Sequence, residues 1–118
     1  MPDFTQIISV SQDTAVESGK SCILFINIEE QSWVLVDADK TVLKKVPDGL
    51  EYREISRDLK IISVTVNGYR YENGCPGIMF FPDGSCEYSE IEIQDFQKGK
   101  RYLVKLNPYI FVPEINEM

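Results

Sequence analysis

The sequence predicts an α+β fold in which one short N-terminal helix packs on antiparallel β-sheets of about seven or eight strands. Three observations predict it: one segment with helical spacing at the start, short β-branched or aromatic runs after it, and Gly, Pro or Asn between the runs. No helical segments alternate with the strands, so a doubly wound parallel sheet is not expected. The 118 residues suit a single globular domain, which can bury a core without metal or disulfide staples.

The helical signal lies in residues 4–17, where Ile7, Ile8 and Ala15 recur at helical spacing. Ser18-Gly19-Lys20 is a helix stop, because glycine is favoured just past a helix end. A helix this short is only marginally stable alone and needs to pack against a sheet. Because it begins so close to the first residue, we interpret residues 1–20 as the stub of a longer helix.

The β domain is expected to span residues 21–112 and to be followed by a frayed tail at 113–118. Its runs alternate in hydrophobicity, as half-buried strands do. We expect residues 50–60 to form a loop with at most one strand. Strands are predicted at 21–28, 33–36, 41–46, 61–66, 69–71, 78–81, 86–93 and 101–106, with 109–112 extending the sheet.

Two Pro-Asp-Gly sequences are expected to be structural turns. Pro47, Asp48 and Gly49 end the strand at 41–46, and Pro82, Asp83 and Gly84 join 78–81 to 86–93 in what is the clearest hairpin of the sequence. Proline presets one dihedral angle and glycine supplies a positive φ. With Asp83 and Gly84 as central residues, Phe81 is expected to face Cys86.

Charge and residue types argue against enzymatic and nucleic-acid-binding functions. The net charge is −7, from 12 basic and 19 acidic residues, so phosphate backbones would be repelled on average. There is no histidine to activate a nucleophile or ligate zinc, and no Gly-rich phosphate loop. We therefore expect no catalytic residues, no cofactor and no metal. No apolar run approaches the length that spans a bilayer.

The three cysteines, Cys22, Cys75 and Cys86, leave two readings open: buried apolar thiols or disulfide partners. In the expected hairpin Cys75 and Cys86 lie about six residues apart along the strand, roughly 20 Å. Their Cα atoms need to be within about 7 Å to be bridged. A Cys75–Cys86 disulfide therefore requires the glycines around Cys75 to fold the chain back, and stays the less favoured alternative.

One cluster of aromatic and basic residues is a candidate contact surface. Tyr69, Arg70 and Tyr71 follow the Asn67-Gly68 turn signal, although strand aromatics commonly form cross-strand pairs. The acidic residues after the hairpin, including Glu90 and Glu92, alternate with isoleucines. That alternation is typical of a half-exposed strand and gives no sign of paired catalytic carboxylates.

An ordered set of segments resembles the soluble domains of minor pseudopilins and minor pilins, over about residues 10–106. A strand in residues 76–85 ends in an aromatic-Pro-Asp-Gly turn and is followed by alternating Ile91-Glu92-Ile93, as in the H-type pseudopilins of type II secretion and their type IV pilus relatives. Upstream come the helix stop, the apolar strand from Cys22, a strand with Trp33, and the step Val46-Pro47-Asp48-Gly49-Leu50. The family's Gly-Phe-Thr-Leu-x-Glu signature and long apolar helix are absent.

The resemblance implies a structural subunit of a pseudopilus or pilus that works by assembly with other pilin or pseudopilin subunits. It implies a cell-envelope location, as a periplasmic domain held at the inner membrane by a missing N-terminal helix, or on the fibre surface. The fragment by itself is expected to be a monomer or weak oligomer. The residues alone leave open a stand-alone β-sandwich module that binds a ligand or peptide, and an enzyme is the least favoured class.

Overall fold

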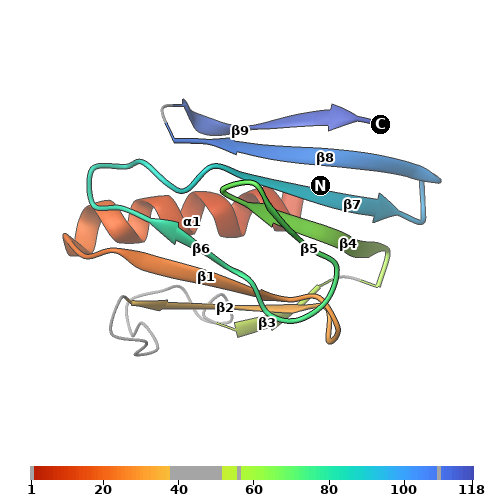
Figure 1. Ribbon diagram of the computed structural model, residues 1–118, viewed down its shortest axis with the longest axis horizontal. Helices are drawn as coiled ribbons and strands as arrows, with labels where there is room; N and C mark the ends of the chain where they lie inside the picture. The colour runs from red at the N-terminus through yellow and green to blue at the C-terminus, as the bar shows by residue number, and fades with distance from the viewer. Residues whose placement is uncertain (1, 38–51, 56, 109) are drawn as a thin grey trace.

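The computed structural model describes residues 2–37, 52–55, 57–108 and 110–118. One helix and two antiparallel sheets enclose a single core (Figure 1). The elements are α1 (Pro2–Ser18), β1 (Cys22–Asn27), β2 (Ser32–Asp37), β3 (Tyr52–Glu54), β4 (Leu59–Val66), β5 (Tyr69–Tyr71), β6 (Gly77–Phe80), β7 (Ser89–Asp95), β8 (Lys100–Asn107) and β9 (Ile110–Glu117). The predicted α+β class is confirmed, with nine strands among the described residues.

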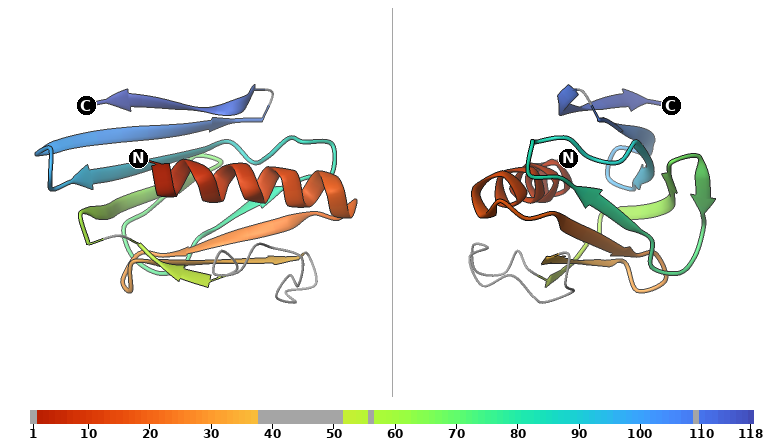
Figure 2. Two further views of the ribbon diagram at one scale, coloured as in Figure 1. Left: turned by 180° about the vertical axis from the view of Figure 1, so that it is seen from behind. Right: turned by 60° about the vertical axis from the view of Figure 1, so that its left-hand side comes forward.

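Helix α1 covers the core along one side, where the two sheets meet (Figure 2). It contacts β1 and β6 of one sheet and β9 of the other. Ile7, Ile8, Ser11 and Ala15 form its buried face, at helical spacing. The Ser11 hydroxyl donates to the Ile7 carbonyl at 2.7 Å, which satisfies this polar group inside the core. Gly19, at φ 68°, ends the helix as predicted.

The first sheet has the order β3-β2-β1-β6. Strands β1 and β2 form the predicted hairpin, in which Leu24 pairs with Leu35 and Ile26 with Trp33. One face of β1 is buried and contributes Cys22, Leu24 and Ile26 to the core. This face lies against α1, which explains why the apolar alternation of β1 is so regular.

The second sheet has the order β5-β4-β7-β8-β9. The predicted Asn67-Gly68 turn joins β4 to β5, with positive φ at both residues (50° and 88°), as a two-residue hairpin requires. Strand β7 is central, and its Ile91 and Ile93 point into the core. The sheet's other face carries the polar alternation, so the two faces follow the sequence pattern.

The hairpin predicted around Pro82-Asp83-Gly84 is only partly formed. Strand β6 pairs with β1, whereas β7 belongs to the other sheet, so this segment crosses from one sheet to the other. A single bridge, Phe80 to Cys86, is all that pairs the two arms, and it replaces the expected pairing of Phe81 with Cys86. The pairing is short because β6 pairs along its length with β1, whereas β7 pairs with β4 and β8.

The tip of this crossing is nevertheless a tight turn. The Gly84 amide donates to the Phe81 carbonyl at 3.0 Å, and the Phe81 amide donates to the Ser85 carbonyl at 2.8 Å. This is a three-residue loop, not the expected two-residue one, with Pro82 in its first position. Gly84 has φ 92°, so the predicted positive φ at this residue is confirmed.

Replacing Gly84 by valine should destabilise the domain by about 1–3 kcal/mol, because a β-branched residue resists positive φ. We expect thermal unfolding to shift down by several degrees, while Gly84→Asn, which tolerates this conformation better, shifts it less. Equal melting temperatures for Gly84→Val and the parent would contradict the turn.

The predicted frayed tail is wrong. Strand β9 continues to Glu117, with Glu117 opposite Tyr102, and the Met118 amide donates to the Arg101 carbonyl at 2.8 Å. Pairing along β8 outweighs the interruption by Pro113, which lies on an edge strand, where proline costs no ladder hydrogen bond. The predicted strand at 41–46 and the turn Pro47, Asp48, Gly49 lie outside the described residues.

Candidate assembly surfaces

The outer side of α1 and the Pro-Asp-Gly turn together line an open groove. Its volume is about 340 Å³, and its walls are Ser9, Gln12, Asp13, Val16, Asp83 and Gly84. The groove thus joins residues about 70 positions apart in the chain, which sequence spacing could not predict. It combines two carboxylates with an exposed Val16, whose surface is 52% accessible.

Asp83 organises the turn at the rim of this groove. Its Oδ1 accepts from the Ser85 amide at 2.9 Å and from the Ser85 hydroxyl at 2.6 Å. The hydroxyl bond, with the amide bond second, lowers the pKa of the Asp83 carboxyl. This carboxylate therefore stays charged, and the groove offers negative charge to an approaching partner.

The predicted contact surface at Tyr69, Arg70 and Tyr71 forms the exposed edge strand β5. Tyr69 and Tyr71 are 73% and 42% exposed. They pair with Val66 and Val64, so their side chains lie on the core-facing side of the sheet, but on its edge strand, where they stay exposed. Arg70 points to the opposite side, toward β7. The three residues are thus exposed as expected but divided between the sheet's two faces, and their role in contacts stays a prediction.

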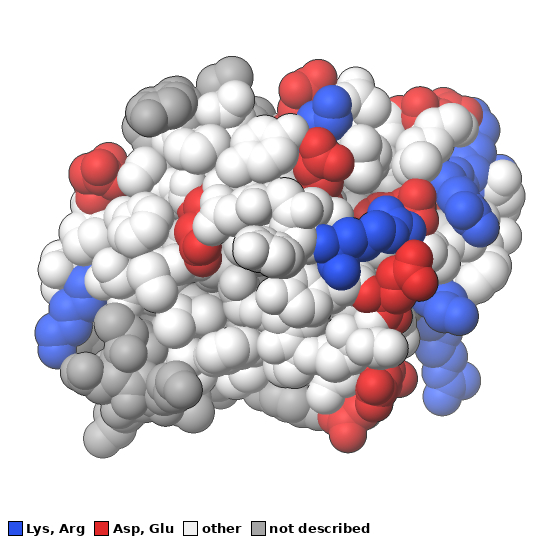
Figure 3. Space-filling model, viewed as in Figure 1, with Lys and Arg blue, Asp and Glu red and all other residues white. Residues whose placement is uncertain are grey.

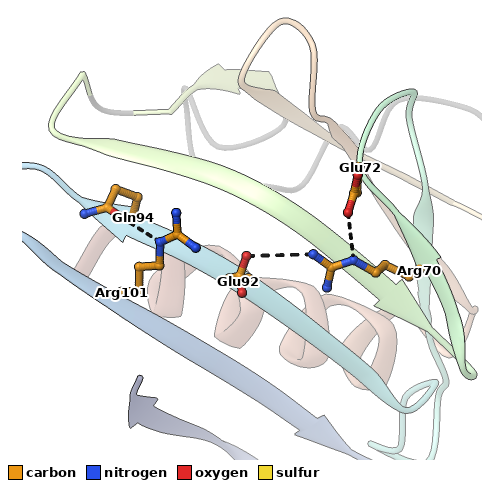
Figure 4. A network of polar contacts seen from close by, with 5 residues as sticks. All are labelled: Arg70, Glu72, Glu92, Gln94 and Arg101. Carbon is orange, nitrogen blue, oxygen red and sulfur yellow. Dashed lines mark hydrogen bonds and ion pairs between the residues drawn. The ribbon is translucent and has the colours of Figure 1, made fainter.

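Arg70 instead belongs to a polar network on the outer face of the second sheet (Figure 4). Its guanidinium lies 3.1 Å from Glu72 and 3.9 Å from Glu92. Glu92 was expected to be half exposed, but its side chain keeps only 11% of its accessible surface. Arg101 donates to Gln94 at 3.0 Å on the same face. The network ties β5 to the centre of the sheet, although exposed ion pairs each contribute little stability.

A residue that sequence reasoning missed, Gln31, joins the two sheets. Its side-chain amide donates to the carbonyls of Ile28 (2.6 Å) and Ile61 (3.0 Å), and its Oε1 accepts from the Ile61 amide at 2.7 Å. The side chain thus pairs with both backbone groups of Ile61, beyond the end of the short neighbouring strand β5. Gln31 holds φ at 53°, uncommon for a non-glycine residue. In the sequence it is only part of a polar break.

Glu87, also missed, fixes the segment that crosses between the sheets. One carboxylate oxygen accepts from the Met79 amide at 2.9 Å and the other from the Asn67 side chain at 2.6 Å. Met79 lies on β6 and Asn67 in the β4–β5 turn, so a single side chain links the two sheets. A local pattern cannot reveal this, because both partners are brought in by tertiary structure.

The alternative Cys75–Cys86 disulfide is not formed: Cys86 is a buried thiol and Cys75 an exposed one, and Cys22 is buried as well. The reason is geometric. Cys86 lies opposite Phe80, and the chain from Cys75 runs on into β6 without folding back. Burial, with a smaller contribution from the charge of Glu87, raises the pKa of the Cys86 thiol to about 11.

One thiol of the folded chain should therefore react well ahead of the other two with a disulfide reagent at pH 8, although burial and the charge of Glu30 raise its pKa, and all three should react in denaturant. The exposed Cys75 is the expected reactive residue, because Cys22 and Cys86 are shielded in the core. Titration of Cys75→Ser gives the control, in which the fast phase should vanish. Two or more fast thiols in the native parent would contradict the burial of Cys22 and Cys86.

Within the described parts of the chain, no group of three or more metal-binding side chains is found. In those same parts, no helix is long and apolar enough to cross a membrane.

Two solved structures of the minor pseudopilin EpsH from the type II secretion system of Vibrio cholerae share this architecture. One superimposes with a TM-score of 0.68 at 12% sequence identity and the other with 0.70 at 13%. Each comparison covers 99% of this chain and 91% of the other. The chain has the fold of a minor pseudopilin. The resemblance first seen in the order of turns and strands is thus confirmed at the level of the fold.

Sequence comparisons give no such match. No protein-family model matches the chain, and no curated protein matches it either. At 12–13% identity the likeness is one of overall fold and not of individual side chains.

Proposed function

We propose that this chain is a structural minor subunit of a type II secretion pseudopilus, acting by assembly with other pseudopilin subunits and not by catalysis. The observation that carries this proposal is a helix docked along both sheets in a fold that matches a minor pseudopilin over nearly the whole chain. Between Gln6 and Glu17, helix α1 has two faces: one is buried in the core and the other is open.

In the proposed assembly, the open face of α1 meets neighbouring subunits. Its exposed side chains Gln6, Ser9, Asp13 and Val16 follow helical spacing, and the groove at Asp83 continues this surface. Such a stripe fits a fibre in which helices pack along a common axis while the β domains lie outside. The acidic groove favours a neighbour that offers a basic side chain.

In this proposal the protein is anchored in a membrane. A transmembrane segment would precede α1 and hold the β domain on the periplasmic side of the inner membrane until the subunit enters the fibre. The direction of α1 supports this arrangement, because its N-terminus points along the long axis of the domain (Figures 1 and 2). A continuous helix could leave the domain there without disturbing the sheets.

Deleting the gene tests the proposal. In the organism that encodes it, loss of this chain should leave the secreted enzymes in the periplasm, and a plasmid copy should restore their secretion. A parallel deletion of a known pseudopilin gene of the same strain gives the reference phenotype. Normal secretion in the deletion strain, measured by the enzyme activity in the culture medium, would contradict the proposal.

A further inference from the structure

Several strand ends of the second sheet lie in one row at one end of the molecule. Leu59 pairs with Asp95, and Asp95 pairs with Lys100. The Phe96 amide donates to the Asp58 carbonyl at 2.8 Å, which closes the row on the β4 side. On the other side, β9 ends where Glu117 faces Tyr102. The row carries five exposed cations and an exposed Phe96, together named the basic end: Arg57, Lys60, Phe96, Lys98, Lys100 and Arg101.

The basic end is positive on an acidic protein. Residues 57–60, 95–101 and 117 hold five cations and three carboxylates, a balance of +2, which leaves −9 for the rest of a chain whose net charge is −7. Glu29 and Glu72 line a pocket together with Lys60, so the positive charge of this end is concentrated at Lys98, Lys100 and Arg101. Two of the three carboxylates are engaged locally. Asp95 is buried and accepts from the amides of Gln97 and Lys98, and Glu117 lies 3.3 Å from Lys100. Figure 3 shows Lys and Arg side chains along this right-hand end of the molecule, with Asp and Glu side chains beside them.

Two further observations concern the position and composition of this end. Helix α1 runs opposite to β1, so its N-terminus points toward the end where the β7–β8 turn lies (Figures 1 and 2). Phe96 stands in that turn and is 59% exposed, between the carboxylate that caps the turn and the cations that follow it. Exposed aromatic rings beside lysine and arginine are typical of protein surfaces at the bilayer–water interface.

We infer that the basic end lies against anionic phospholipid headgroups when the N-terminus of α1 is held at a membrane. The inference rests on the proposed function, which supplies the anchor. Lysine and arginine close to an anionic surface are attracted within about a Debye length, so a tether makes even a few of them effective. Nucleic acid fits less well, because tracking a phosphate backbone needs a longer basic stripe than one row of turns.

The test uses this chain with an N-terminal hexahistidine tag, bound to vesicles that contain a nickel-chelating lipid in place of the anchor. Phe96→Trp reports contact with brominated lipids through quenching of its fluorescence, measured against the parent, whose Trp33 is buried. We expect about twofold stronger quenching on vesicles with roughly 30% phosphatidylglycerol than on phosphatidylcholine alone. Tyr69→Trp, exposed at the opposite end of β4, should be quenched on neither.

Charge reversal locates the effect. Lys98→Glu with Lys100→Glu should abolish the extra quenching of Trp introduced at position 96. The matched pair Lys20→Glu with Lys105→Glu changes the net charge equally but lies elsewhere, and should leave the quenching in place. Three results would each overturn the inference. They are equal quenching at position 96 on the two kinds of vesicle, equal loss of quenching in the two charge-reversal pairs, and quenching of the tryptophan at position 69.

Binding of a short DNA duplex by the parent, lost in Lys98→Glu with Lys100→Glu and without lipid quenching, would also overturn it and indicate a nucleic-acid surface. Because the tag replaces the natural anchor, the vesicle result does not depend on whether the proposed transmembrane segment exists. If the vesicles give the expected stronger quenching but the deletion strain secretes normally, the proposed function is rejected and the inference about the basic end is not.

Discussion

Replacing Ile8 by aspartate should cost about 4 kcal/mol or more and lower the melting temperature by about 15 °C. Ile8 is fully buried between α1 and the sheets, so a carboxylate there is placed in the core without a partner. Because α1 contacts strands of both sheets, loss of helix docking is expected to open the whole core and not the helix alone. Circular dichroism during heating measures the effect.

The neighbouring residue gives the control for Ile8→Asp. Ser9 is exposed on the other side of α1, so Ser9→Asp adds the same carboxylate in the same turn of helix without burying it. Its melting temperature should stay within a few degrees of the parent. If Ile8→Asp melted as close to the parent as Ser9→Asp does, α1 would not be part of the folded core.

Replacing Gln31 by alanine should cost about 2–4 kcal/mol, the second largest effect we expect. The substitution removes the three side-chain hydrogen bonds and leaves the amide and carbonyl of Ile61 without the group that pairs with them. These groups are partly buried, so water replaces Gln31 only incompletely. Urea unfolding should show a lower midpoint with an unchanged slope.

Two further substitutions separate the hydrogen bonds of Gln31 from its backbone strain. Gln31→Gly loses the amide but accepts the positive φ, so it should be less destabilising than alanine by up to about 1 kcal/mol. Gln31→Glu keeps the acceptor but sets a carboxylate oxygen against the carbonyl oxygens of Ile28 and Ile61, so it should be at least as destabilising as alanine. An alanine variant as stable as the parent would show that the amide does not hold the sheets together.

Local patterns predicted the elements whose stability is decided locally. The helix stop at Gly19, the β1–β2 hairpin and the Asn67-Gly68 turn all depend on residues adjacent in sequence. Each combines a glycine or turn residue with regular alternation, and each is confirmed. The α+β class follows from the same signals, since a chain with one helix and many short strands has few other ways to bury them.

Features set by partners distant in sequence could not be predicted. The strand after Pro82-Asp83-Gly84 joins the other sheet because β4 pairs with one of its edges and β8 with the other. Nothing in the local sequence distinguishes this crossing from a long hairpin. Gln31 and Glu87 act on groups that the fold brings to them. The tail at 113–118 was underestimated, because its strand is stabilised by pairing with β8 and not by its own composition.

The residue types that the sequence lacks and the order of its turns and strands indicated more about function than any single motif. The ordered set of turns and strands indicated a pilin-like domain. The groove between α1 and the turn at Asp83, and the basic end, emerged only with the tertiary structure. In the basic end, Lys98, Lys100 and Arg101 are neighbours in the sequence, but only the fold adds Arg57 and Lys60 to them.

Cysteine cross-linking in cells tests assembly through α1 most directly. The full-length gene, with Cys75→Ser to remove the exposed thiol, would carry Val16→Cys on the open face of the helix or, as control, Glu30→Cys on the exposed β1–β2 turn. We expect Val16→Cys to form a covalent adduct with another pilin-like subunit after addition of a reagent that joins the thiol to a lysine amine of the neighbour, and Glu30→Cys to form none. No adduct at Val16→Cys, or equal adducts at both positions, would contradict assembly through this face.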